Sequence, residues 1–199
     1  MSPLTELIGG AKVYGWGKLI ETGPFESIAT VSVGSGGSAN AEFTSIPATY
    51  SHLQVRVFAK TNRSDATTDI VKVTVNSDTG TNYAWHLLGG YGANPVFTDK
   101  GTSSNYIRTD WVAGNGTGSS NVFGTFVMDI LDYANTNKYK TFRTLAGVDL
   151  NSGSTDSRIY FESGLWMSTN AITSIKFAPL DGTGFLQYSQ FALYGIRTA

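Results

Sequence analysis

The sequence predicts an all-β protein, an antiparallel β-sandwich that is jelly-roll-like and carries an extended N-terminal arm. From Phe25 onward, apolar and polar residues alternate with the period of two that is typical of half-buried strands. Glycine occurs 23 times and aromatic residues make up 13% of the chain, which indicates many turns between aromatic-rich strands. No capped stretch with a period of 3.6 residues is present, so we expect no helix.

The alternation is clearest in two segments. Residues 52–60 place apolar side chains on one face and polar side chains on the other, namely Leu53, Val55, Val57 and Ala59 against Gln54, Arg56 and Lys60. Residues 70–76 do the same with Val71, Val73 and Val75 against Lys72, Thr74 and Asn76. Both patterns predict antiparallel strands with one face in the core and one in solvent. The side chains that we expect to be buried are Val55, Val57, Val73, Val75 and Leu193.

The same alternation predicts further strands, which are separated by turns rich in Gly, Asn, Asp and Ser. They cover residues 25–33, 41–46, 83–88, 106–112, 123–131, 139–146, 158–167, 173–177 and 190–196. Short strands at this spacing are typical of sandwiches and barrels.

Residues 1–24 differ from the remainder and are expected to form an N-terminal arm or anchor, with residues 25–199 as the β-sandwich domain. Glycines interrupt the apolar residues of the arm, so no period survives and the arm is not expected to form an element of its own. An apolar segment of this kind must lie against something else, either its own domain or a neighbouring subunit. We favour the neighbouring subunit, and the partner-binding residues of the arm are then Leu7, Ile8, Val13, Tyr14, Trp16, Leu19 and Ile20.

Composition excludes several kinds of function. The chain has no cysteine, which excludes disulfides, thiolate metal sites and cysteine nucleophiles. Its 14 basic and 15 acidic residues give a net charge of −1, so neither nucleic acid nor an anionic membrane is an expected partner. Near-neutral charge does permit assembly into something larger. The first residues lack the pattern of a secretory signal and no apolar run is long enough to span a membrane, so we expect synthesis in a cytoplasm.

Catalytic and metal-binding motifs are absent from the sequence. The two histidines, His52 and His86, lie in no HxH or HExxH pattern, and each is interpreted as a strand residue with local hydrogen bonds. No GxSxG elbow and no Walker or dinucleotide glycine motif occurs, and the glycines of 34–37 lack the lysine and helix that phosphate binding needs. We therefore expect no enzyme activity and no cofactor.

The carboxylates leave two alternative functions open, a glycosidase site and a calcium-binding loop. A glycosidase needs two carboxyl groups about 5–10 Å apart in a groove that binds sugar. The residues that could supply them are Asp129, Asp132, Asp149 and Glu162. Two loops, 76–82 and 149–156, also carry oxygen ligands at alternating positions, as a calcium loop does. Both have too few carboxylates for a typical calcium site, and Asp and Asn favour tight turns in any case, so the turn interpretation is preferred.

The tryptophans can be core residues or binding residues. Exposed Trp stacks on sugar rings and anchors protein interfaces, whereas buried Trp fills a core. We expect Trp85 and Trp166 in the core. Trp111 lies beside the glycine-rich segment 114–118, where a binding tip could form, and Trp16 is the best candidate for an anchor to another subunit.

Several ordered phrases carry a resemblance to a known family. They are Phe25-Glu26-Ser27-Ile28-Ala29-Thr30-Val31, Ser45-Ile46-Pro47-Ala48-Thr49-Tyr50-Ser51-His52-Leu53-Gln54-Val55-Arg56, Asn76-Ser77-Asp78-Thr79-Gly80-Thr81-Asn82-Tyr83, Ile130-Leu131-Asp132-Tyr133-Ala134-Asn135-Thr136, Leu165-Trp166, Ala171-Ile172-Thr173-Ser174-Ile175 and Gln187-Tyr188-Ser189-Gln190-Phe191-Ala192-Leu193-Tyr194-Gly195-Ile196. Together they resemble a family of structural proteins from the virions of tailed phages. The resemblance covers about residues 25–196 and leaves out the arm.

The resemblance implies a place in the virion and brings no catalytic residues. The expected function is a capsid decoration (cement) protein, made in the host cytoplasm and attached to the head lattice by its arm. Its expected partners are the major capsid protein or another virion protein, and further copies of itself in a homotrimer. The alternative is a tail-associated receptor-binding or adaptor module that recognises a host saccharide.

Overall fold

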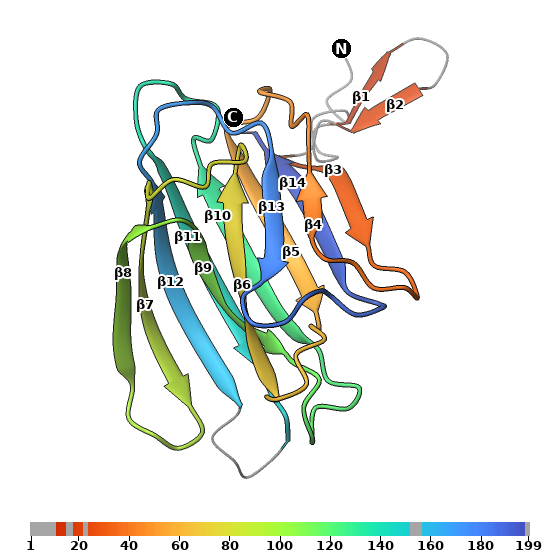
Figure 1. The fold of residues 1–199 in the computed structure, drawn as a ribbon. Coiled ribbons are helices and arrows are strands. Elements are labelled where there is room, and N and C mark those ends of the chain that lie inside the picture. The colour runs from red at the N-terminus through yellow and green to blue at the C-terminus, as the bar shows by residue number, and fades with distance from the viewer. Residues whose placement is uncertain (1–10, 15–17, 22–23, 152–156, 198–199) are drawn as a thin grey trace.

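The computed structural model describes residues 11–14, 18–21, 24–151 and 157–197, the first two ranges by their backbone alone. Every regular element in these ranges is a β-strand, and two antiparallel sheets pack face to face (Figure 1). The predicted all-β sandwich is confirmed. In the same ranges, no helix is long and apolar enough to cross a membrane.

The two sheets differ in size. The larger has eight strands, in the spatial order β3 (Phe25–Ser32), β14 (Gln190–Ile196), β5 (His52–Ala59), β10 (Gly124–Leu131), β11 (Lys140–Val148), β12 (Arg158–Trp166), β7 (Tyr83–Tyr91) and β8 (Phe97–Ser104). The smaller has four strands, in the order β4 (Ala41–Phe43), β13 (Ile175–Pro179), β6 (Thr68–Val75) and β9 (Ile107–Ala113).

Eight of these strands have the order of a jelly roll. Along the chain they are β3, β4, β5, β6, β9, β10, β13 and β14. The first, eighth, third and sixth of them lie side by side in the larger sheet, and the second, seventh, fourth and fifth form the smaller sheet. Two Greek keys wrapped into one sandwich produce this order, so the jelly-roll prediction is confirmed as well.

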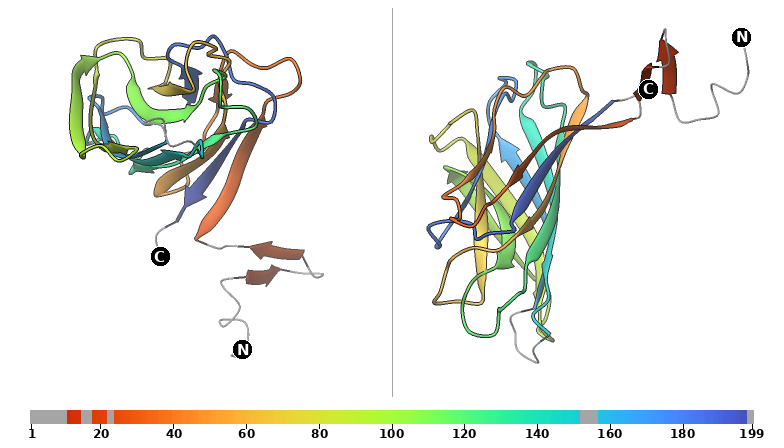
Figure 2. Two further views of the ribbon diagram at one scale, coloured as in Figure 1. Left: turned by 90° about the horizontal axis from the view of Figure 1, so that it is seen from below. Right: turned by 90° about the vertical axis from the view of Figure 1, so that its right-hand side faces the viewer.

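Two inserted strand pairs widen the larger sheet. The pair β7–β8 is inserted between β6 and β9, and the pair β11–β12 follows β10. Both join the sheet beyond β10, so the larger sheet extends well past the smaller one (Figures 1 and 2). Arginine and aromatic side chains fill the space over the inner face of this extension, where the Arg158 guanidinium lies 4.1 Å from the centre of the Trp111 ring.

The core lies between the sheets and follows the alternation of the sequence. The five side chains expected to be buried, Val55, Val57, Val73, Val75 and Leu193, are all in it. Phe177 of the smaller sheet contacts Phe126 and Phe191 of the larger one, with ring centres 6.1 and 5.4 Å apart. In β5 and β6 the apolar face is therefore the face that meets the opposite sheet.

Lys60 departs from the expected pattern. The alternation places it on the polar face, but its side chain is buried at the end of β5. There the chain leaves the sheet, and the segment after β9 folds over it, so that Lys60 Nζ donates a hydrogen bond to the carbonyl of Ser119 at 2.5 Å. The prediction for Lys60 is wrong because a loop distant in sequence covers the residue.

The arm also differs from expectation in part. Strands β1 (Ala11–Tyr14) and β2 (Lys18–Glu21) pair as an antiparallel hairpin, although the glycine-interrupted sequence was not expected to form an element. Both views of Figure 2 show this hairpin beyond the edge of the sandwich. Within the described residues β1 and β2 join neither large sheet.

Candidate functional site

Four of the seven residues predicted to bind a partner lie in this hairpin. Val13 and Tyr14 are in β1, and Leu19 and Ile20 are in β2, with the backbone of Val13 opposite that of Leu19. Leu7, Ile8 and Trp16 lie outside the described residues. The structure thus brings four of the seven residues into one hairpin, and it places that hairpin away from the core.

The two histidines differ in their surroundings. The Asp132 backbone N–H donates to His52 Nδ1 at 3.0 Å, and the Asp132 carboxylate lies 3.5 Å from the same nitrogen. Because the Asp132 side chain also accepts a hydrogen bond from the Lys138 ammonium, the pKa of Asp132 is lowered. His52 therefore closes the turn after β10, as the local hydrogen-bond interpretation predicts. His86 is exposed on β7.

The two strand carboxylates face opposite sides of the larger sheet. Asp129 lies on the outer face, where Arg143 Nη2 donates to it at 3.2 Å and Gln54 Nε2 at 2.8 Å. Glu162 is buried on the inner face of β12, between the inward residues Tyr160 and Gly164. A sheet separates these carboxylates, so they cannot flank one glycosidic bond.

Loop 76–82 is a hydrogen-bonded turn. The Asp78 carboxylate accepts hydrogen bonds from the Gly80 backbone N–H, Asn82 Nδ2 and Trp166 Nε1. Asn76 Oδ1 accepts from the backbone N–H groups of Thr173 and Ser174. The oxygens that a calcium ion would use thus bind the protein itself.

The second candidate calcium loop is described only in part, because residues 152–156 lie outside the described residues. Asp149 Oδ1 accepts from the Asn151 N–H at 2.8 Å, which is an ordinary turn contact. Among the described residues, no group of three or more His, Asp or Glu side chains could hold a metal ion.

The tryptophans that the structure describes belong to the packing. Trp166 is buried, and Trp85 is half-buried against the core, as predicted. Trp111 does not form a binding tip. Its ring is half-buried and lies beneath the guanidinium groups of Arg158 and Arg108.

A row of apolar side chains crosses the solvent side of the larger sheet. Val127 of β10 is opposite Leu145 of β11, Leu145 is opposite Phe161 of β12, and Phe161 is opposite Leu88 of β7. In the adjacent row, Phe58 and Ile159 are likewise exposed. We call these residues the outer apolar face; it consists of Phe58, Leu88, Val127, Leu145, Ile159 and Phe161.

The outer apolar face is large for a soluble protein. Its side chains are between 37% and 62% exposed. Together they expose on the order of 600 Å², which is the upper end of the largest apolar patch on an ordinary monomer. Gly90 and Gly147 adjoin Ile159 across the strands and leave a shallow groove of about 900 Å³ beside it.

Sequence reasoning missed this face, although a signal was available. In β12, outward residues such as Ile159 and Phe161 are apolar while the inward Glu162 is charged. Strands with apolar residues at both parities are typical of sheets covered on both sides. Strand β10 shows the same pattern, because Val127 points outward while the apolar residues Phe126 and Met128 point into the core.

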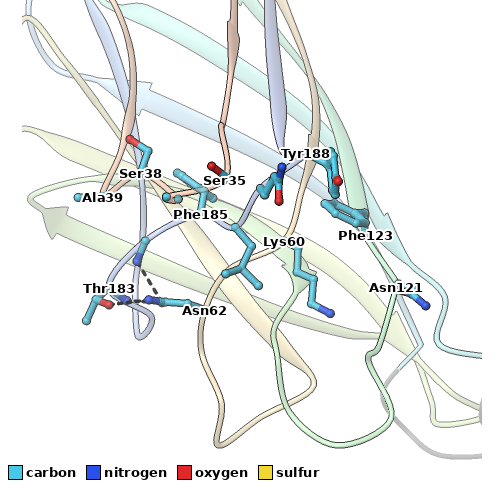
Figure 3. Close-up of a pocket in the computed structure, with 15 residues that line it drawn as sticks. Ser35, Ser38, Ala39, Lys60, Asn62, Asn121, Phe123, Thr183, Phe185 and Tyr188 are labelled. Atoms are coloured by element: carbon cyan, nitrogen blue, oxygen red, sulfur yellow. Dashed lines mark hydrogen bonds between the residues drawn. The ribbon is translucent and has the colours of Figure 1, made fainter.

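A second hollow, of about 570 Å³, lies at the end of β5 (Figure 3). Four segments line it, namely residues 35–39, 60–62, 121–123 and 183–188. Figure 3 shows Tyr188 and Phe123 above Lys60, with Asn121 on the loop beyond it. Asn62 fixes one wall, because its side chain donates to Thr183 Oγ1 at 2.7 Å and accepts from the Thr183 N–H at 2.8 Å. We call this hollow the Lys60 pocket.

Tyr188 has an unusual backbone at the rim of the Lys60 pocket. Its φ is +74°, in the left-handed region that costs a non-glycine residue about 1 kcal/mol or more. The hydrogen bond from its N–H to the Val33 carbonyl helps to hold this conformation. The ring gains no core packing in return, since Tyr188 is 72% exposed. The fold therefore presents an aromatic ring to solvent at some cost.

Comparison with known proteins adds no assignment. No protein-family model matches the chain, and no curated protein matches it significantly.

Proposed function

We propose that this chain is a structural protein of a tailed-phage virion, and most simply a capsid decoration protein attached to the head lattice by its N-terminal arm. The outer apolar face is the observation that carries the proposal, because a surface of this kind is suited to permanent contact with other proteins. The resemblance of residues 25–196 to phage virion proteins supports the location.

Further copies of the chain are the proposed occupant of the outer apolar face. Its exposed area approaches the roughly 800 Å² that one partner contributes to a stable protein interface. A net charge of −1 gives little repulsion between copies. The adjacent polar row contains the Asp129–Arg143 ion pair, which supplies both signs of charge at the rim. We propose a homotrimer whose larger sheets meet.

The arm supplies the contact with the lattice. Burying a few hundred Å² of its apolar residues yields several kcal/mol at about 25 cal/mol per Å². Ordering a glycine-rich segment consumes part of this, so a single arm binds weakly. Three arms on one trimer bind together, and their combined attachment is firm.

Deletion of residues 1–24 tests the arm. The truncated protein is expected to stay folded and to bind undecorated capsids poorly, whereas the full chain binds them well. Trp16→Ala should lose part of the binding, and Lys18→Ala, a polar change in the same arm, should lose little. Full binding by the truncated protein would contradict attachment through the arm.

A tail-associated module that recognises a host saccharide is the second candidate. The Lys60 pocket, with the exposed ring of Tyr188 at its rim, favours it. The two candidates differ in the number of copies per virion, which is large for a head protein and small for a tail protein.

A further inference from the structure

We propose that the Lys60 pocket binds an acidic saccharide, with a sugar ring against Tyr188 and a carboxylate directed to the side of the pocket where Lys60 lies. This goes beyond attachment to a capsid, which requires the arm and the outer apolar face but no small ligand, and it names a ligand class for the second candidate function. Three features of the pocket support the inference, namely its charge, its aromatic rim and its unused polar groups.

The charge of the pocket comes from one residue. Lys60 is the single charged side chain among the described residues that line it. Lys60 is 6% exposed, and its ammonium group has one hydrogen-bond acceptor in the described chain, the Ser119 carbonyl. An ammonium group has three N–H donors, and a buried cation is stabilised by a nearby anion. No carboxylate of the described residues lies within ion-pair distance of Lys60, so a carboxylate from a ligand would supply the missing countercharge.

The rim offers flat rings to a ligand. Tyr188 is the most exposed large hydrophobic residue of the described chain. Phe123, on the same pocket, is stacked on Phe58 with ring centres 4.6 Å apart and planes 9° from parallel, which fixes its orientation. The apolar face of a sugar ring packs against such rings, while the hydroxyl groups at its edge remain free for hydrogen bonds.

Two side-chain amides at the pocket could form hydrogen bonds with those hydroxyl groups. Asn121 is exposed at the pocket with a φ of +58°, and its amide makes no hydrogen bond to the described residues. Gln187 lies on the opposite segment and its amide is likewise unused within the described chain. Asn62, by contrast, is occupied in holding the 183–184 backbone. The wall is therefore pre-organised, which limits the entropy lost on binding, and the amides of Asn121 and Gln187 are free to bind hydroxyl groups.

Titration of the full chain with two matched probes tests the inference. The first probe is a tetrasaccharide of alternating glucuronic acid and N-acetylglucosamine, and the second is the same tetrasaccharide with its carboxyl groups reduced to alcohols. We expect the acidic probe to bind about tenfold or more tightly than the reduced one, because only it pairs with the ammonium group. Amide NMR shifts on binding should cluster in residues 35–38 and 183–188. Equal affinity of the two probes, or shifts elsewhere, would overturn the proposal.

Substitutions assign the roles within the pocket. Tyr188→Asn removes the ring and keeps a residue that tolerates positive φ, and it should weaken binding of the acidic probe about tenfold. The matched control is Tyr139→Asn. It removes a half-exposed tyrosine just before β11, at the end of the larger sheet away from Lys60, and should leave the affinity for the acidic probe unchanged. Unchanged affinity of Tyr188→Asn would refute the sugar-stacking role. Lys60→Met should abolish the preference for the acidic probe. If that variant does not fold, the affinities of the unsubstituted chain for the two probes still test whether the pocket recognises a carboxylate.

A simple anion site is the competing outcome. Sodium acetate at the same concentration should not produce the shifts in 183–188, because it has no ring for Tyr188. Acetate shifts equal to those of the acidic tetrasaccharide would show an anion site without saccharide recognition and would contradict the proposal. Failure of this site would leave the attachment through the arm untouched, since neither probe involves the arm.

Discussion

The indole N–H of Trp166 donates a hydrogen bond of 2.7 Å to Oδ2 of Asp78. Trp166 ends β12 in the extended part of the larger sheet, and Asp78 lies in the turn after β6 of the smaller sheet. The same carboxylate accepts from the backbone N–H of Gly80 at 2.9 Å. One side chain thus joins the two sheets and closes the turn.

Replacing Asp78 by Ala should lower the free energy of unfolding by about 1–3 kcal/mol. The substitution leaves the N–H of a buried indole without its acceptor and opens the turn. Asp65→Ala is the matched control, because Asp65 forms an ion pair with Arg63 at an exposed position, where solvent screens the pair and its contribution to stability is small. Chemical denaturation of both variants measures the difference, and equal losses would contradict the role given to Asp78.

The contribution of Asp78 should depend on pH. Burial raises the pKa of its carboxyl group, but the hydrogen bonds from Trp166, Asn82 and Gly80 outweigh burial and lower the pKa below its usual value. A lowered pKa stabilises the fold above the unfolded value of about 4, and this stabilisation is lost as the pH falls through the folded pKa. The stability difference between the unsubstituted chain and Asp78→Asn should therefore be largest near neutral pH and shrink in acid. A stability difference that stays constant from neutral to strongly acidic pH would contradict the stabilising role of the ionised Asp78 carboxylate.

Val73→Asp should cost about 3 kcal/mol or more, because it places an unpaired charge in the core. Val73 is fully buried opposite Phe177 of β13 and Ile107 of β9. Its neighbour Lys72 is half-buried on the other face of β6, so Lys72→Asp serves as the control and should cost much less. Thermal unfolding of the two variants compares the faces directly, and similar melting temperatures would mean that the face is assigned incorrectly.

Much of the fold could be predicted from the sequence, because period-two alternation reports which face of a strand meets the core. Strands β5 and β6 show this clearly. Strand β8 was not predicted. It carries Asp99, Lys100 and Gly101 and lies at the edge of the sheet, where no second sheet selects for an apolar face. The hairpin of β1 and β2 was missed for a related reason, since its two strands pair only with each other among the described strands.

The candidate sites could be predicted less well. The outer apolar face arises from the lateral order of β10, β11, β12 and β7, which brings residues far apart in sequence into one row. The Lys60 pocket needs the meeting of four segments, and the burial of Lys60 depends on the loop that carries Ser119. The pattern of β12 shows that outward positions such as Ile159 and Phe161 are apolar, but alternation within one strand does not say which strands lie beside it. The positive φ of Tyr188 has no local signal either, because tyrosine is not a residue that favours it.

Substitution of the outer apolar face should weaken self-association without unfolding the chain. Leu145→Ser combined with Phe161→Ser removes two adjacent members of the row, and both side chains are about half exposed, so the core is unaffected. The proposed trimer should shift to monomer in sedimentation or light scattering. Arg143→Ser, on the same strand and face but in the polar row, should leave the assembly largely intact. An unchanged assembly of the double variant would exclude this face as the contact.

The chain should release no reducing sugar from polysaccharide. The outward Asp129 is bound to Arg143 and Gln54, and Glu162 faces the core, so these two strand carboxyl groups do not share one groove. Reducing-sugar assays with purified protein measure this. Activity that disappears in Asp129→Asn or in Glu162→Gln would show that the chain is an enzyme.

The number of copies per virion tests the decoration function most directly. Quantitative mass spectrometry of purified particles, with the major capsid protein as the internal reference, gives this number. A decoration protein on the head lattice is present in hundreds of copies, and that is the result expected here. Absence from the particle would contradict a virion protein altogether, and a few copies to a few dozen would place the chain on the tail and contradict the decoration function.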